Sequence, residues 1–455
     1  MSAPASTHPP RPAPGPIREY HFPAAERLTL GNGLAVVVAP IPRLPLATVL
    51  AVTDAGAVWD TAGREGLAQL VAKLMPEGAG QLEGAELAEA FERLGATMES
   101  SADWDAAVFS MTVTSARLAP AFALFADVLR RPVFREREIE RLKAERLAEL
   151  IQLRAEPRGL ADEAFGSAIY DSSSRYAIAE GGTEKTVDRI STEDVTSLYA
   201  RRYAPGTTTL IVTGDVTTAT VAQLAKKHLG DWAGRAQRGK LPTDKPARTT
   251  RALHLIEKAD APQSELRIGH VGVPRTHPDY FDIVVMNAIF GGLFNSRVNL
   301  NLREAHAYTY SAFSAFDWRR GAGPFVVSTA VKTDTTASSI REVINEMERI
   351  RSERVAADEL SLATSYLDGV FPIRFETTAA VAGSLANQVI YGLPLDYFDS
   401  YRAHIRAVTA DSVLAAARRH LDPSRLQAVV VGDASALRRQ LEELKFGPLV
   451  VDPER

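Results

Sequence analysis

The sequence TEDVTSLYARRYAPGTTTLIVTGD, at Thr192–Asp215, has a second copy more than 200 residues further along the chain. That copy, Thr409–Asp433, reads TADSVLAAARRHLDPSRLQAVVVGD. Each copy begins like a capped helix, runs through Ala-Arg-Arg, turns at a proline and ends in an apolar strand followed by Gly-Asp. A repeat of this length is too long for a solenoid, so it predicts two homologous domains in tandem.

A segment with almost no large apolar residues separates the two copies. Residues 233–250 are rich in Gly, Arg, Lys, Pro and Thr, which is typical of a linker. We therefore expect an N-terminal domain over 18–232 and a C-terminal domain over 251–455, after a flexible Pro- and Ala-rich tail at 1–17. Strand and helix patterns mix without strict alternation. This favours an α+β fold in which each domain is a mainly antiparallel sheet covered by helices on one side.

Apolar periodicity predicts the individual elements. We expect strands near 26–38, with a hairpin turn at Asn32-Gly33, and near 47–55, 96–101, 106–114, 252–257, 265–273, 308–316 and 323–330. We expect helices near 66–75, 84–94, 118–129, 136–154, 279–290, 297–305, 335–351 and 356–371.

The composition excludes several classes of function. The formal charge of −4 over 455 residues gives no global reason to bind nucleic acid or an anionic membrane, and we expect no membrane span. The absence of cysteine removes disulfides, thiolate metal sites and cysteine nucleophiles. The nine histidines include no pair at i, i+3 or i+4 spacing. The Pro-rich start and the lack of cysteine lean toward the periplasm, with the cytoplasm as the alternative compartment.

The stretch GLAQLVAKLM at Gly66–Met75 is predicted to form a helix with one buried face. Four of its apolar residues fall at i, i+3, i+4 and i+7, which makes a single apolar stripe. Three residues lie off this stripe, one turn apart: Gln69, Ala72 and Lys73.

This helix resembles the zinc helix of the pitrilysin and mitochondrial-processing-peptidase family, the inverzincins, whose motif is H-x-x-E-H. In that motif the two His bind zinc and the Glu is the general base. Here Gln69, Ala72 and Lys73 hold those three positions, and none of them supplies that chemistry. The family's third zinc ligand, counted 76 residues on from Lys73, falls on Glu149. One carboxylate cannot hold zinc, so the resemblance implies a degenerate site without a metal.

A second stretch resembles the C-terminal half of the same family. Gly291–Arg297 is glycine-rich, and Asn301–Ser311 reads NLREAHAYTYS. In the family, an Arg and a Tyr seven apart face the zinc across a closed chamber, and Arg303 and Tyr310 have that spacing. The resemblance implies that both hydrogen-bond the substrate backbone near the cleaved bond. The plain alternative is a helix-end Arg in a salt bridge and a Tyr in the core.

The resemblance implies a function within a two-chain assembly. Two such chains close like a clam, and one often brings zinc while the other brings the Arg/Tyr pair. We therefore expect a non-zinc subunit of a heterodimeric metallopeptidase that degrades peptides, inactive alone, with zinc in a homologous partner. The alternatives are a purely structural core-type subunit, a homodimeric peptide-binding module, and an active peptidase with an unusual metal site.

Overall fold

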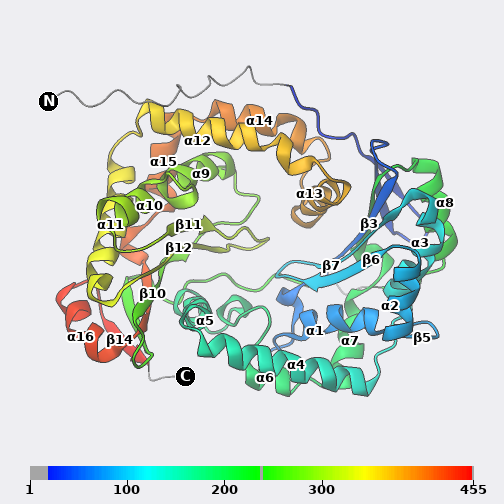
Figure 1. The fold of residues 1–455 in the computed structure, drawn as a ribbon, viewed down its shortest axis with the longest axis horizontal. Coiled ribbons are helices and arrows are strands. Elements are labelled where there is room, and N and C mark those ends of the chain that lie inside the picture. Colours follow the sequence, from blue (N-terminus) through cyan, green and yellow to red (C-terminus); the bar gives the residue numbers. More distant parts are fainter. Residues whose placement is uncertain (1–18, 236–238, 453–455) are drawn as a thin grey trace, which may run out of the picture.

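The computed structural model describes residues 19–235 and 239–452, so the tail expected at 1–17 lies outside the described residues. Two six-stranded sheets, each flanked by helices, make up the protein (Figure 1). The first sheet contains β1 (Glu26–Thr29), β2 (Ala35–Pro40), β3 (Leu46–Thr53), β6 (Thr97–Ala102), β7 (Ala107–Thr114) and β8 (Thr208–Gly214). The second contains β9 (Ala252–Glu257), β10 (Gln263–Val271), β11 (Ala312–Phe316), β12 (Pro324–Lys332), β13 (Gln427–Gly432) and β14 (Leu449–Asp452).

The two sheets repeat one strand order. The first runs β2-β8-β3-β7-β6 and the second runs β9-β13-β10-β12-β11, with β1 and β14 added at the outer edges. In each, a corresponding parallel pair (β2 with β8, β9 with β13) adjoins antiparallel pairs, and the second sheet has a further parallel pair of β14 with β9. Strands β8 and β13 come from the two repeat copies, and every one of their residues is buried. Continuous apolar runs are expected for strands covered on both faces.

The helices of the first half are α1 (Leu67–Leu74), α2 (Gly84–Arg93), α3 (Leu118–Arg130), α4 (Glu136–Ala155), α5 (Pro157–Ile169), α6 (Glu184–Asp188), α7 (Thr192–Arg202) and α8 (Thr218–Leu229). Those of the second half are α9 (Tyr280–Asn287), α10 (Arg297–Asn299), α11 (Thr336–Ser352), α12 (Ala357–Val370), α13 (Thr378–Tyr391), α14 (Tyr397–Ala407), α15 (Ala410–His420) and α16 (Ala434–Glu443). Most lie where the apolar periodicity predicts a helix.

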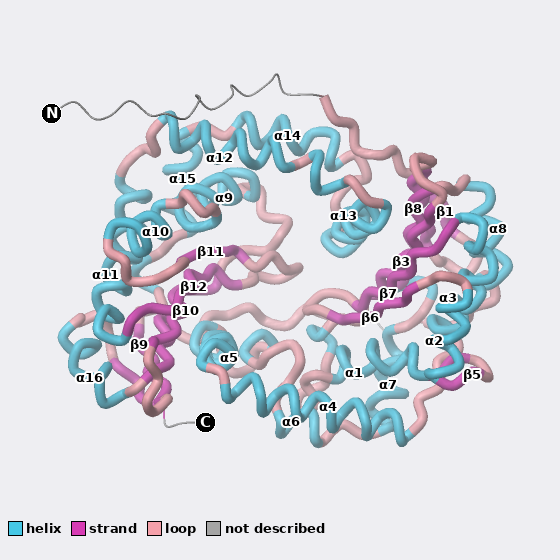
Figure 2. The backbone as a smooth tube through the Cα atoms, viewed as in Figure 1, coloured by secondary structure: helices cyan, strands magenta, loops and turns pink. Residues whose placement is uncertain are grey.

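The central strands of each sheet are covered on both faces, and the second cover comes from the other half of the chain. Helix α13 packs on β3 and β8, where the Thr48 hydroxyl lies 2.8 Å from that of Thr378. Helix α5 packs on β10 and β13, so that Phe165 shares a core with Val429. Figure 2 shows both helices between the sheets. The expected α+β fold with helix-covered sheets is confirmed. Helices lie on both sides of the central strands and not on one side only, because each half of the chain supplies a helix to the other half's sheet.

The turn between β11 and β12 also ties the halves together. The Arg320 guanidinium donates to Asp54 Oδ1 at 2.7 Å, and its backbone N–H donates to Asp105 Oδ2 at 2.9 Å. The Tyr170 hydroxyl donates to the Ala322 carbonyl at 2.7 Å. The turn is therefore held by groups of the first half, and the two halves share one packed interior.

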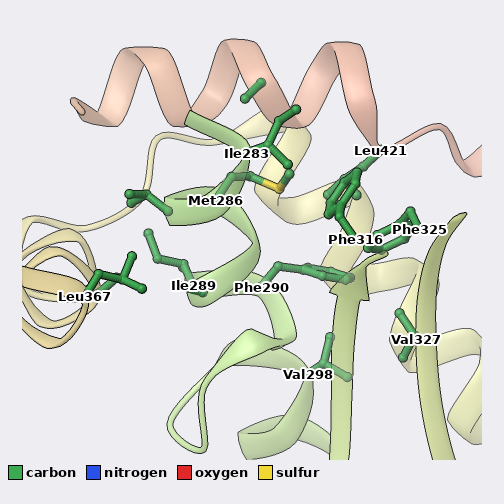
Figure 3. Packing of buried hydrophobic residues seen from close by; sticks show 14 of the residues in the cluster. Ile283, Met286, Ile289, Phe290, Val298, Phe316, Phe325, Val327, Leu367 and Leu421 are labelled. Atoms are coloured by element: carbon green, nitrogen blue, oxygen red, sulfur yellow. The ribbon is translucent and has the colours of Figure 1, made fainter. Parts of the chain in front are cut away.

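The stretch Tyr280–Ala305 supplies the core of the second half. It is long and apolar enough to resemble a membrane span, but 61% of its most apolar window is buried inside the protein. Its apolar character is accounted for by packing against β11 and β12. Figure 3 shows the side chains that meet there: Ile283, Met286, Ile289, Phe290, Phe316 and Phe325.

The buried His270 on β10 predicts a loss of stability in acid. Burial lowers the pKa of His270 to about 4, with the ring Nε2 accepting from the Asp422 amide at 3.2 Å. Between about pH 6.5 and 4 the unfolded chain therefore binds a proton that the folded chain does not. We expect the free energy of unfolding to fall with decreasing pH there, by up to about 1.4 kcal/mol per pH unit from this group.

Urea unfolding of wild type and His270→Gln at several pH values measures this contribution. The variant should show a shallower dependence, whereas His21→Gln, which removes an exposed imidazole, should match wild type. Equal slopes for His270→Gln and wild type would contradict the assignment.

Candidate functional site

Helix α1 is fixed at its start by a glycine and a buried aspartate. Gly66 has φ +99°, and a Cβ there would lie 2.7 Å from the Gly181 carbonyl oxygen, so only glycine fits without strain. The Asp60 carboxylate accepts from the amides of Gly66 and Ala68 at 2.9 and 2.8 Å. Arg175 pairs with the same carboxylate at 2.9 Å. These contacts satisfy the free amides of the helix N-terminus and hold its position. No sequence pattern pointed to Asp60 or Arg175.

The structure brings Lys73, at the position of the motif's second His, together with Glu149, at the position of the family's third zinc ligand. Lys73 Nζ lies 3.6 Å from Glu149 Oε1, across from α1 to α4. Arg146 donates to Glu149 Oε2 at 3.1 Å. Burial tends to raise the pKa of Glu149, but Arg146 and Lys73 outweigh it and lower the pKa. Two cations therefore hold this carboxylate as an anion. Ala72 lies fully buried in the core beneath.

Gln69 contacts an acidic group that sequence reasoning missed. Its amide Nε2 donates to Glu180 Oε1 at 3.3 Å. Burial, together with the nearby Asp103 charge, raises the pKa of Glu180. Glu180 lies in a loop more than a hundred residues from Gln69, and no local pattern marks it.

Arg303 and Tyr310 lie on one cavity of about 410 Å³, together with Gln263, Glu304 and Lys332. Arg303 belongs to a π-helical segment, Leu300–Ala305, an irregularity often found at functional sites. Its guanidinium lies 4.6 Å from the Phe294 ring centroid, and its Nε lies 3.3 Å from Glu304. Tyr310 is 87% exposed and has no hydrogen-bond partner among the described residues. The plain alternative expected Tyr310 in the core, and the structure instead has it exposed to solvent. The salt bridge that the same alternative expected for Arg303 is present, with Glu304.

Comparisons with known proteins bear on this arrangement. Residues 36–178 match the family model described as Insulinase (Peptidase family M16), and residues 189–367 match the model described as Peptidase M16 inactive domain. The chain belongs to peptidase family M16. It is the pitrilysin-type family that the degenerate helix resembles, and this M16 chain lacks the zinc motif.

Relatives of this M16 chain extend over nearly its whole length. An uncharacterized zinc protease of Mycobacterium tuberculosis is 23% identical over 426 residues, covering 93% of this chain and 96% of the relative. One of Bacillus subtilis is 21% identical over 357 residues, covering 78% and 85%. A crystal structure titled peptidase M16 inactive domain, from Pseudomonas fluorescens, has a TM-score of 0.84 at 25% identity, covering 90% and 98%. A Helicobacter pylori protease gives 0.84 at 18% identity, covering 90% and 99%.

The residues of this M16 chain do not fit the family's zinc ion. Zinc sites need several histidine, cysteine or carboxylate ligands, and of the four residues at the motif positions only Glu149 is of that kind. The Lys73 ammonium lies 3.6 Å from one oxygen of this carboxylate, and the Arg146 guanidinium lies 3.1 Å from the other. Both would repel a metal. Lys73 instead neutralises the Glu149 carboxylate by forming an ion pair with it.

Among the described residues of this M16 chain there is one further group of side chains of the kinds that bind metals, and its hydrogen bonding explains why they lie together. His277, Asp279 and His420 have ligand atoms within 4.8 Å of one another. The Asp279 carboxylate takes a 2.6 Å hydrogen bond from His420 and a 3.1 Å contact with Arg419, and His277 Nδ1 accepts the Asp279 amide. These bonds join the start of α9 to the end of α15, where such charges suit the helix dipoles. Arg419 already supplies the cation.

Proposed function

We propose that this M16 chain is the non-zinc subunit of a heterodimeric zinc peptidase. The observation that carries the proposal is a contrast between two sites. Lys73, at the position of the motif's second His, pairs with Glu149, while Arg303 and Tyr310 remain open on a cavity with hydrogen-bonding groups to spare. A purely structural subunit needs no exposed donor pair. The partner would be a homologous chain that keeps the zinc motif.

In this proposal, Arg303 and Tyr310 hold the peptide that the partner cleaves. A guanidinium and a phenol both donate, so they can bind a peptide carbonyl and stabilise negative charge on it. The Phe294 ring beneath the Arg303 guanidinium limits its motion, which favours preorganised binding. The partner's zinc site would supply the activated water.

The edge of β11 favours peptide addition to the partner's sheet and not to this one. The Ala312 amide donates to Asn299 Oδ1 at 2.9 Å, and the Ser314 carbonyl accepts from Asn287 Nδ2 at 3.1 Å. Both of these backbone groups are therefore occupied by side chains of the same half. An extended peptide pairs best with an edge whose backbone groups are free.

Reconstitution with the homologous zinc-binding chain tests the proposal. The isolated chain should show no peptidase activity, and the mixture should cleave peptides. Arg303→Ala and Tyr310→Phe should each lower kcat/KM of the mixture by about tenfold or more, the effect of losing a hydrogen bond that involves charge. Arg439→Ala, on the exposed face of α16, is the matched control and should leave the rate unchanged.

Assembly is followed in the same samples by gel filtration. Normal assembly with unchanged kinetics in both variants would refute the role of Arg303 and Tyr310. A stable homodimer that binds peptides, with no partner required, would favour the homodimeric peptide-binding module.

A further inference from the structure

A second cavity, of about 540 Å³, opens on another part of the C-terminal half and shares no lining residue with the Arg303–Tyr310 cavity. Its walls come from the start of α9, the end of β11, the segment after α12, and helices α13 and α14. Aromatic rings dominate these walls, among them Tyr280, Phe316, Trp318, Phe371, Tyr391 and Tyr401. Cavities of this size in which charged groups meet aromatic side chains are candidate ligand sites.

The polar groups of this cavity carry a positive charge without a protein counter-ion. Arg275 is 91% buried, with its guanidinium 3.6 Å from the Tyr280 ring centroid and one hydrogen bond, at 2.7 Å, to the Tyr397 hydroxyl. It pairs with no carboxylate in the described part of the chain. Arg374 also lines the cavity and is exposed, and its side chain makes neither a hydrogen bond nor an ion pair within the described residues.

The acidic group in the same cavity is already neutralised. Asp317 accepts from Arg319 Nε at 2.9 Å, so it does not compensate Arg275 or Arg374. A guanidinium removed from water without a counter-ion is costly, and an anion entering the cavity would remove that cost. The planar fork of Arg275, stacked on a ring, is already oriented for a carboxylate.

We propose that this cavity binds the C-terminal carboxylate of a peptide whose last residue is apolar or aromatic. The carboxylate would lie between Arg275 and Arg374, and the last side chain among the aromatic rings. An adjoining cavity of about 320 Å³ shares Tyr280, Trp318 and Arg374 with the first and gives the preceding residues a path. Two connected cavities fit an extended chain better than a small acid. This inference rests on the proposed function as a peptide-binding subunit, but it uses different residues.

Binding to the full, isolated chain tests the inference without a partner or hydrolysis. Two hexapeptides ending in Phe, one with a free carboxylate and one with an amide, are titrated by calorimetry and by the fluorescence of Trp318. The free acid should bind about tenfold tighter or more. Arg374→Gln, an exposed position that folding does not require, should bring the two peptides to equal affinity, and Trp318→Phe should remove the fluorescence change.

Arg439→Gln, at an exposed position outside both cavities, is the control and should keep the preference for the free acid. Equal binding of acid and amide by wild type, or a preference that survives in Arg374→Gln or disappears in Arg439→Gln, would overturn the inference. N-acetylphenylalanine binding as tightly as the hexapeptide would overturn the assignment to peptides. If acid and amide bind equally while Arg303→Ala still slows the reconstituted enzyme, this inference alone fails.

Discussion

The triple variant Gln69→His, Ala72→Glu, Lys73→His is expected to bind one zinc ion per chain, whereas wild type binds none. The physical reason is the geometry of Glu149. Its Oε1 lies 3.6 Å from Lys73 Nζ, and its Oε2 accepts a hydrogen bond from Arg146. Removing the Lys73 ammonium frees one oxygen for the metal, while the other keeps the hydrogen bond that orients a ligating carboxylate. Two His and one Glu then form a common catalytic zinc set.

Elemental analysis after dialysis, and competition with a chromogenic chelator, measure the gain. Zinc at a thousand times its Kd should stabilise the folded triple variant by about 4 kcal/mol. Adding Glu149→Gln to the triple variant should weaken zinc binding strongly, while the single change Lys73→His should not create a site. A folded triple variant that keeps no zinc would show that α1 and α4 do not hold the ligands in register.

Replacing Asp60 by Ala is expected to destabilise the protein by about 4 kcal/mol or more. The change leaves the Arg175 guanidinium buried without its carboxylate, and it leaves the amides of Gly66 and Ala68 without an acceptor. Burial raises the pKa of Asp60 to about 6 despite the opposing effect of Arg175, so the carboxylate is mostly charged at pH 7.5. The loss is therefore that of a buried ion pair and a helix cap together.

Urea unfolding at pH 7.5 measures this loss, with Arg64→Ala as the matched control. Arg64 makes an ion pair with Asp194 at 2.9 Å near the same helix, but both side chains are partly exposed. Such pairs contribute about 1 kcal/mol or less. If Asp60→Ala lowers the free energy of unfolding no more than Arg64→Ala does, then Asp60 does not stabilise the N-terminus of α1.

Several features of this protein follow from local sequence pattern. The repeat that ends in Gly214 and Gly432 predicts two sheets of one design, and the sheets do share a strand order. The apolar stripe of α1 predicts its buried face, and six of its eight residues are buried. Period and spacing suffice here, because a side chain's direction within one helix or strand is set by its position in that element.

Contacts between distant segments follow from no local pattern. Nothing in the sequence marks Glu180 as the partner of Gln69 or gathers Arg275 and Arg374 on one cavity. No local pattern predicts that α5, from the first half, covers the second sheet, or that α13, from the second half, covers the first sheet. The physical reason is that the spacing of apolar residues indicates which side chains are buried. Which residues they contact depends on how whole helices and strands pack together. The sequence alone determined that the zinc motif is absent, and only the tertiary structure decided that Lys73 pairs with Glu149 while Tyr310 stays open to solvent.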